Sequence, residues 1–170
     1  MTAHPYCLGV AVDASALERL LEDGEVGGYR DAEPWHVAAD LLAAAQERGE
    51  RLYLLMASDS PLRWVRWAEV TEIEVHEYAS RRETRLRFAR SGDMNPIFED
   101  LDAVVLRAPQ HQLEREQREG LRRRRIHVDP SWLHAYAICE TPSFLLAGDP
   151  ADAPQAARTG GTGAADTDAD

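Results

Sequence analysis

Two tryptophans and two arginines are the residues of this chain best suited to binding a flat or anionic ligand. They lie between Arg63 and Trp67, soon after the polar turn Ser58 to Pro61. An indole ring can stack on a base, a Ser or Asp side chain can hydrogen-bond its edge, and Arg can contact phosphate. The spacing predicts a base pocket of Ser58, Asp59, Trp64 and Trp67, flanked by phosphate-binding Arg63 and Arg66. The alternative is a packed core with the arginines outside.

Every basic residue is Arg, 19 in all, and two further groups are suited to a phosphate backbone. Side chains at alternate positions of a strand point to the same face, so Arg85 and Arg87 would form an outward stripe. The predicted phosphate-binding residues of these two groups are Arg81, Arg82, Arg85 and Arg87, and Arg122, Arg123, Arg124 and Arg125. The alternative is charge balance against Glu83, Glu114, Glu116 and Glu119.

Other chemistries find little support. The lack of Lys excludes Schiff-base and Lys-nucleophile mechanisms, and no G-x-S-x-G motif is present. Glu72, Glu74 and His76 share a strand face, but the outer two would lie about 13 Å apart on a straight strand, too far to hold one metal ion. We therefore predict no metal and no cofactor, and we favour a binding protein over an enzyme.

The composition is acidic, with a net charge of −11 and a pI of about 5.0. This charge disfavours nucleic acid and supports an alternative role as a protein-interaction or regulatory partner. Cys7 and Cys139 form no C-x-x-C motif, which predicts free thiols in a cytoplasmic protein of bacterial type. We find no apolar segment typical of a signal peptide or a membrane span, so no membrane association is predicted.

Two strands and a turn are predicted around the candidate pocket. Leu52 to Ala57 is almost wholly apolar, which is typical of a strand buried on both faces. Trp64 to Val75 alternates and then changes phase, which indicates a β-bulge that bends the sheet. A polar turn over His76 to Arg82 is predicted next, and then a strand over Thr84 to Arg90, with Leu86 and Phe88 inward.

Further elements are predicted on either side of this centre. Tyr6 to Val12 and Tyr136 to Cys139 are typical of strands, and Gly27 to Asp31 of a loop. One helix is predicted to begin at Ser15 with a capping box to Glu18, and a second at Pro34. The predicted apolar stripe of the second helix is Val37, Ala38, Leu41, Leu42 and Ala45, and Trp35 and Trp132 are predicted core residues.

The order of these elements resembles that of PUA-like domains of the EVE/ASCH type. The likeness covers about residues 52–146. It rests on the W-A-E-V-T-E-I-E-V strand from Trp67, the Thr-Arg-x-Arg-Phe strand from Thr84 and the Tyr-Ala-Ile-Cys-Glu ending from Tyr136. The resemblance implies a small, strongly bent β-barrel that holds a base, in RNA or in modified DNA, in a side pocket. The Lys-Thr-Glu set of some ASCH amidohydrolases is not carried over, because this chain has no Lys.

The expected fold is therefore α+β: a small, strongly bent PUA-like β-barrel with flanking helices and a disordered acidic C-terminal tail. Residues 1–50 would supply a strand and two helices, 51–147 the barrel, and 148–170 the tail. The expected function is nucleic-acid binding, with a modified base as one candidate ligand. A protein-interaction role is the alternative, and a modified-nucleoside hydrolase is the least favoured.

Overall fold

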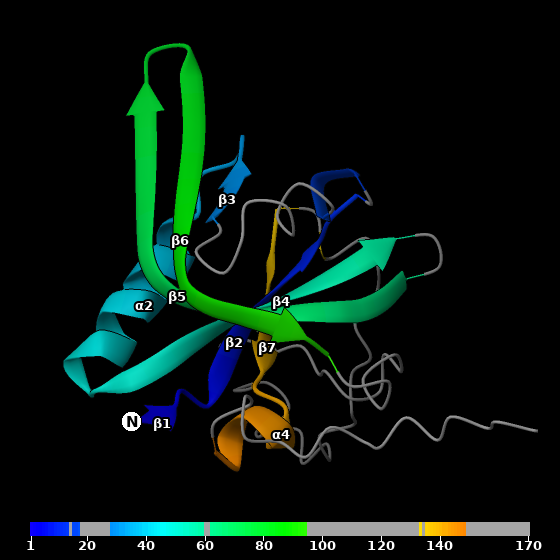
Figure 1. The fold of residues 1–170 in the computed structure, drawn as a ribbon. Helices are drawn as coiled ribbons and strands as arrows, with labels where there is room; N and C mark the ends of the chain where they lie inside the picture. The colour runs from blue at the N-terminus through cyan, green and yellow to red at the C-terminus, as the bar shows by residue number, and fades with distance from the viewer. Residues whose placement is uncertain (14, 18–27, 60–61, 95–132, 134, 149–170) are drawn as a thin grey trace, which may run out of the picture.

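The computed structural model describes residues 1–13, 15–17, 28–59, 62–94, 133 and 135–148. Its strands are β1 (Thr2–Ala3), β2 (Tyr6–Ala11), β3 (Gly28–Asp31), β4 (Glu50–Asp59), β5 (Leu62–Tyr78), β6 (Arg81–Asp93) and β7 (Ala137–Glu140). Two helices, α2 (His36–Glu47) and α4 (Ser143–Leu146), accompany them. Within these residues the strands form one mixed sheet in the order β3-β6-β5-β4-β2-β7, and β1 also pairs with β4 (Figure 1).

Strand β4 lies at the centre of the sheet and is buried on both faces. Alternate side chains of β4 enter two hydrophobic clusters, Leu52, Leu54 and Met56 on one face and Tyr53, Leu55 and Ala57 on the other. Its neighbours are β2, which runs parallel to it, and β5, which runs antiparallel. The prediction of a doubly buried strand followed by a hairpin is confirmed.

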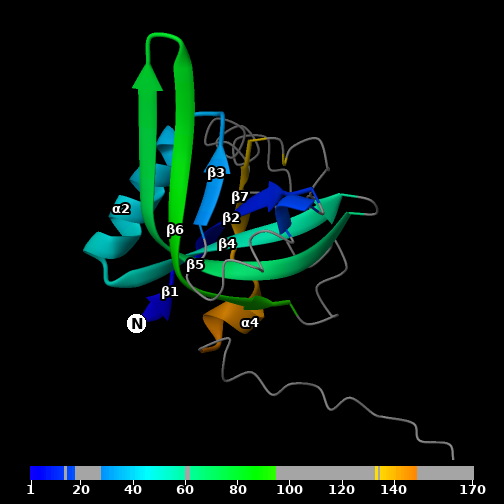
Figure 2. The same cartoon turned by 45° about the horizontal axis from the view of Figure 1, so that its top comes forward.

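A bulged region divides β5 and β6 into two parts. The pairing register shifts between Glu69 and Val70 and again between Val70 and Glu72, where the predicted phase change lies. Beyond this point the two strands bend away together as a hairpin, which we call the hairpin arm (residues 72–87; Figures 1 and 2). Strand β3 pairs with β6 over residues 84–87, and the arm projects as a two-stranded ribbon beyond them. The predicted bulge and bend are confirmed. The prediction of a seven-residue turn is wrong, because only Ala79 and Ser80 form the turn and the polar residues around them continue the strands.

Helix α2 covers one face of β4 and β5. Its buried side chains are Ala38, Leu42 and Ala45, whereas Leu41 is half-buried and Val37 is 58% exposed. The helix begins at His36 rather than at Pro34. Trp35 precedes it and is fully buried, and its backbone N–H donates a hydrogen bond of 3.0 Å to the Thr84 hydroxyl. The start of the helix is therefore tied to β6.

Two local predictions in the N-terminal region are corrected by the structure. Gly28–Asp31 is strand β3, not a loop, and it pairs antiparallel with β6. A Cβ atom at Gly28 would lie only 2.7 Å from the Leu86 carbonyl oxygen, so this close approach requires glycine. Asp13, not Ser15, caps the segment 15–17, because its side chain accepts the Ala16 N–H at 2.7 Å. Glu18 lies outside the described residues.

The described sheet is open. Its end strands are β3 and β7, and no pairing joins them within the described residues, so the closed barrel stays a prediction. β2 lies inside the sheet between β4 and β7, so residues 1–50 contribute to the same core as residues 51–147. Trp132 and the predicted tail from 149 onwards lie outside the described residues. In the described part no helix is long and apolar enough to cross a membrane.

Cys7 and Cys139, remote in sequence, meet where β2 and β7 pair. They are register partners, and both are completely buried. Burial raises the pKa of Cys139 to about 12, and burial is also the main reason that the pKa of Cys7 is raised. Both thiols are free, as predicted, but their proximity was not predicted, because neither residue belongs to a local motif.

We predict that replacing Leu42 by Ala lowers the free energy of unfolding by about 2–5 kcal/mol, because buried methyl groups are lost and a cavity remains. Val37→Ala on the same helix is the matched control. It should change stability by no more than about 0.5 kcal/mol, because that side chain is largely exposed. Urea unfolding followed by circular dichroism measures both variants. Equal losses would contradict the burial of this helix face.

We also predict that the protein loses stability in alkali. In the unfolded chain the thiols ionise near pH 9, whereas in the folded protein the pKa of Cys139 is about 12. The unfolded state therefore releases protons first, so stability is fully present below about pH 9 and declines as the pH rises towards 12. The urea midpoint at about pH 8, 9 and 10 measures this decline, and Cys139→Ala should make its slope shallower. A midpoint that stays constant would contradict the prediction.

Candidate binding site

The structure places both tryptophans of the predicted base pocket in the core. Trp64 is 1% exposed and Trp67 is 5% exposed, and both belong to the cluster that contains Tyr53 and Leu55. The Tyr53 ring lies edge-on to Trp67, with centroids 5.9 Å apart. The Trp64 indole N–H is buried without a hydrogen-bond partner among the described residues. This geometry favours the core interpretation over the pocket.

Close contacts with two glycines hold the tryptophan rings in place. A Cβ atom at Gly9 would lie 3.0 Å from Cη2 of Trp64, and one at Gly92 would lie 2.8 Å from Cζ2 of Trp67. The Arg90 guanidinium also lies over the Trp67 ring, 5.9 Å from its centroid. Both rings are therefore closely packed, and the face of Trp67 under Arg90 has little room for a stacked base.

The structure describes the remaining residues of the predicted pocket in part. Ser58 is half-buried and pairs across the hairpin with Arg63, which is exposed. The backbone of Asp59 pairs with Leu62, and its side chain lies outside the described residues. The Arg66 guanidinium is hydrogen-bonded to Asp93 at 3.2 Å and to Ser91 at 2.9 Å. Arg66 is therefore engaged within the sheet.

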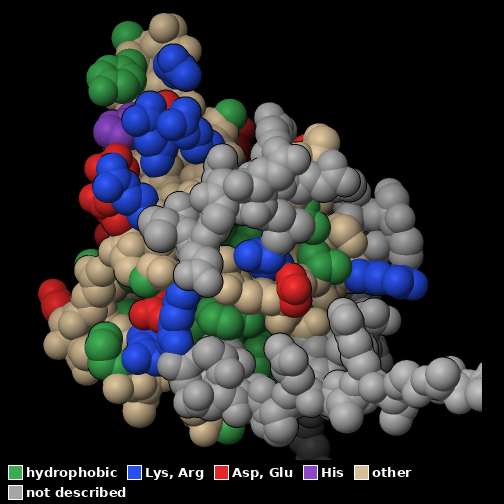
Figure 3. Space-filling model, in the orientation of Figure 1, with side chains coloured by type: hydrophobic (Ala, Val, Ile, Leu, Met, Phe, Trp, Pro, Cys, Tyr) green, Lys and Arg blue, Asp and Glu red, His purple; other side chains and the backbone are tan. Residues whose placement is uncertain are grey.

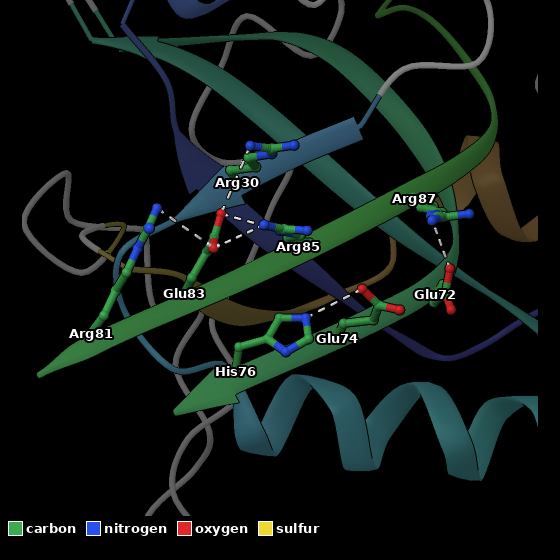
Figure 4. A network of polar contacts seen from close by, with 8 residues as sticks. All are labelled: Arg30, Glu72, Glu74, His76, Arg81, Glu83, Arg85 and Arg87. Atoms are coloured by element: carbon green, nitrogen blue, oxygen red, sulfur yellow. Dashed lines mark hydrogen bonds and ion pairs between the residues drawn. The ribbon is translucent and has the colours of Figure 1, made fainter. Parts of the chain in front are cut away.

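The predicted arginine stripe lies on the outward face of the hairpin arm. Arg81, Arg85 and Arg87 lie on this face of β6 (Figure 4). The register sets Tyr78, Glu74 and Glu72 opposite them. Arg30 of β3 joins the same face opposite Arg85. Arg82 points to the other side of the ribbon, opposite Glu77. The run Arg122 to Arg125 lies outside the described residues.

Carboxylates are interleaved with these arginines. Glu83 sits among three of them: Arg85 donates two hydrogen bonds of 3.2 Å to its carboxylate, and Arg81 and Arg30 each approach it to 3.9 Å (Figure 4). The hydrogen bond from Arg85 is the main reason that the pKa of Glu83 is lowered, and the charges of the other two arginines act in the same direction. The predicted charge balance by Glu83 is therefore present.

The distances between arginines and carboxylates are shorter near the base of the arm than towards its tip. Near the bulges, Arg90 lies 2.6 Å from Glu69, and Arg87 lies 3.1 Å from Glu72. Towards the tip, all contacts of three arginines with carboxylates are 3.9 Å, beyond hydrogen-bond distance. These are Arg30, Arg81 and Arg82, whose side chains are 71%, 74% and 65% exposed. Figure 3 shows Arg side chains gathered on this part of the arm, with acidic side chains beside them.

An exposed aromatic side chain completes the tip. Tyr78 is 69% exposed, and its ring is parallel to that of His76, with centroids 6.2 Å apart. An open hollow of about 750 Å³ lies here, lined by Ala32, Glu77, Tyr78, Ala79, Ser80, Arg81 and Arg82. We define the arm tip as Arg30, Tyr78, Arg81 and Arg82. The arm tip combines long, exposed cationic side chains with an aromatic ring, and it is the candidate binding site.

Sequence reasoning missed two residues of the arm tip. Tyr78 continues the alternation of Glu72, Glu74 and His76, so extending the strand by three residues would have placed it on the outward face. Arg30 has no such signal, because its position depends on the pairing of β3 with β6. Within the described residues, no group of three or more His, Cys, Asp or Glu side chains is arranged to hold a metal ion.

We predict that Gly92→Ala destabilises the protein by about 1–3 kcal/mol, because the new methyl group would collide with the Trp67 ring. Trp67→Phe removes part of that ring, so the two substitutions should be non-additive. A double-mutant cycle measured by urea unfolding should give a favourable coupling of about 0.5–3 kcal/mol. Strictly additive losses would contradict the contact between ring and glycine.

Comparison with models of protein families, with curated proteins and with solved structures finds no match for this chain. The resemblance to PUA-like domains therefore rests on the layout of the sequence alone.

Proposed function

We propose that this chain is a protein-interaction module that uses the arm tip to bind an acidic segment of a partner protein. The observation that carries the proposal is the contrast along the arm. Arg81 and Arg82 at the tip are exposed and only loosely paired, and together with the exposed Tyr78 they line the hollow at the turn. Arg87 and Arg90, nearer the sheet, are closely paired.

The chemistry of the tip suits a protein interface. Tyr and Arg are enriched at such interfaces, because each supplies a large contact area together with directed hydrogen bonds. A guanidinium at 3.9 Å from its carboxylate has no hydrogen bond to give up, so it can turn to a carboxylate of the partner at little cost. Arg85 would first have to break its two hydrogen bonds to Glu83.

The charge of the arm favours a short acidic segment over a nucleic-acid backbone. A nucleic acid that followed the arm would pass Glu72, Glu74 and Glu83, whose charges repel phosphate. Residues 149–170 hold five Asp and one Arg, so residues 1–148 still carry −7 of the total net charge of −11. A peptide that engages the tip alone avoids most of these carboxylates.

Nucleic-acid binding is the second candidate. Three arginines surround the carboxylate of Glu83, so arginines outnumber carboxylates at that point. The resemblance of the sequence to PUA-like domains would agree with this role. Because Trp64 and Trp67 are buried, the contact surface would then be the arm rather than the predicted pocket.

A binding assay with two matched probes tests the proposal. The probes are a fluorescent oligoglutamate peptide and a single-stranded oligothymidylate of equal charge, with affinity measured by fluorescence anisotropy at low salt and at about 0.15 M salt. We expect the peptide to bind more tightly. The double substitution Arg81→Ala with Arg82→Ala should weaken binding at least about tenfold, and Tyr78→Ala should weaken it at both salt concentrations, because the ring contributes contact area rather than charge.

Arg87→Ala is the matched control. Its side chain is 73% exposed on the same face, but it is paired with Glu72 at 3.1 Å and lies away from the tip. It should leave peptide affinity within about twofold. Tighter binding of the oligothymidylate, with a salt slope that Arg87→Ala reduces by about one, would instead establish the nucleic-acid candidate. Failure of both probes to bind would refute both roles.

A further inference from the structure

The pairing of Cys7 with Cys139 juxtaposes the two thiols of the chain. The register of β2 and β7 sets these residues directly opposite each other, so their side chains leave the sheet on the same face. Both enter the cluster that contains Tyr53 and Trp64, and both are completely buried. Neither thiol takes part in the binding site described above.

The hydrogen-bond pattern of this strand pair defines the separation of the two residues. Thr141 donates its N–H to the Pro5 carbonyl at 2.9 Å, so Pro5 and Thr141 occupy a hydrogen-bonded position of the antiparallel pair. Such positions alternate, so Cys7 and Cys139, two residues further along, occupy the next one. Their Cα atoms should therefore be about 5.5 Å apart, which lies within the range that a disulfide spans.

The Cβ atoms at such a position are also about 5.5 Å apart, whereas a relaxed disulfide holds them at about 3.5–4.5 Å. Closing the bond therefore requires the two strands to draw together by about 1 Å. A disulfide formed under this constraint is strained, and strained disulfides are reduced more easily than structural ones. The geometry thus favours a reversible disulfide over a permanent structural one.

We propose that Cys7 and Cys139 are a redox modification site, at which a hydroperoxide produces a reversible disulfide that fastens β7 to β2. In the first step, one thiol loses its proton and the thiolate attacks the peroxide, whose O–O bond breaks. The sulfur becomes a sulfenic acid, and with hydrogen peroxide the leaving hydroxide takes up the released proton and becomes water. In the second step, the other thiol loses its proton, its thiolate attacks this sulfur, the S–S bond forms and the S–O bond breaks, and the leaving hydroxide takes up that proton as a second water. The two thiols lose two electrons, and the peroxide gains them.

Access to the thiols depends on the position of β7. This strand is four residues long and forms one end of the described sheet, where it pairs with β2 alone. Short end strands open locally more readily than central ones, and opening would expose both thiols at once. Because burial raises the pKa of both thiols, the closed strand keeps them protonated and unreactive. The oxidation should therefore be slow in the closed state and limited by strand opening.

Mass spectrometry of the full chain after treatment with hydrogen peroxide tests the proposal. We expect the intact mass to fall by about two mass units, which is the loss of two hydrogens, and both thiols to disappear. Peptide mapping without reduction should recover one peptide pair that joins Cys7 to Cys139. Excess reduced glutathione should then restore both thiols without denaturant, because the bond is strained.

The single substitutions Cys7→Ser and Cys139→Ser are the controls. Each leaves one thiol without its partner, so peroxide should add oxygen or link two chains, with no loss of mass in the monomer. The wild-type peptide map decides the question even where a variant fails to fold. Oxygen added to separate cysteines, links between chains, or a disulfide that forms only in urea would each overturn the proposal. Resistance of the bond to glutathione would overturn its reversibility.

Discussion

The burial of β4 on both faces is the constraint on which the rest of the fold depends. A strand with apolar side chains on both sides needs apolar packing on each face. Here α2 and Trp35 pack on one face, and on the other Trp64 and Trp67 of β5 pack in one cluster with Tyr53 and Leu55. The two backbone edges of β4 also need partners, which β2 and β5 supply. Trp64 and Trp67, which the sequence suggested for stacking on a base, are therefore part of the core that packs on β4.

The bulges next to Val70 separate the two roles of β5 and β6. On one side of the bulges, the strands extend the central sheet and hold Trp67 over Gly92. On the other side, the strands leave the central sheet as the hairpin arm (Figure 1). The arm has an inner face tied to the helix layer through Thr84 and Trp35, and an outer face that meets solvent. The outer face carries paired Arg and Glu side chains, as solvent exposure allows, and charged side chains on a projecting ribbon discourage edge-to-edge association.

The two proposed sites lie in different parts of the sheet and rest on different physics. The arm tip depends on exposed charge and an aromatic ring, and it belongs to the β3-β6-β5 end of the strand order. The cysteine pair depends on burial and on strand register, and it belongs to the β2-β7 end. Because β4 separates the two ends, binding at the tip and oxidation of the thiols can be measured independently.

The sequence by itself determined the elements whose signals are local. The apolar run of β4, the phase change in β5 and the stripe of α2 were all readable, because alternation and helical periodicity depend only on neighbouring residues. The tertiary structure alone decided which strands pair and in what register. That pairing buried Trp64 and Trp67, brought Arg30 to the arm, placed Glu83 among three arginines and set Cys7 opposite Cys139. Local patterns cannot specify such contacts, because the partners are remote in sequence and meet only when the whole sheet assembles.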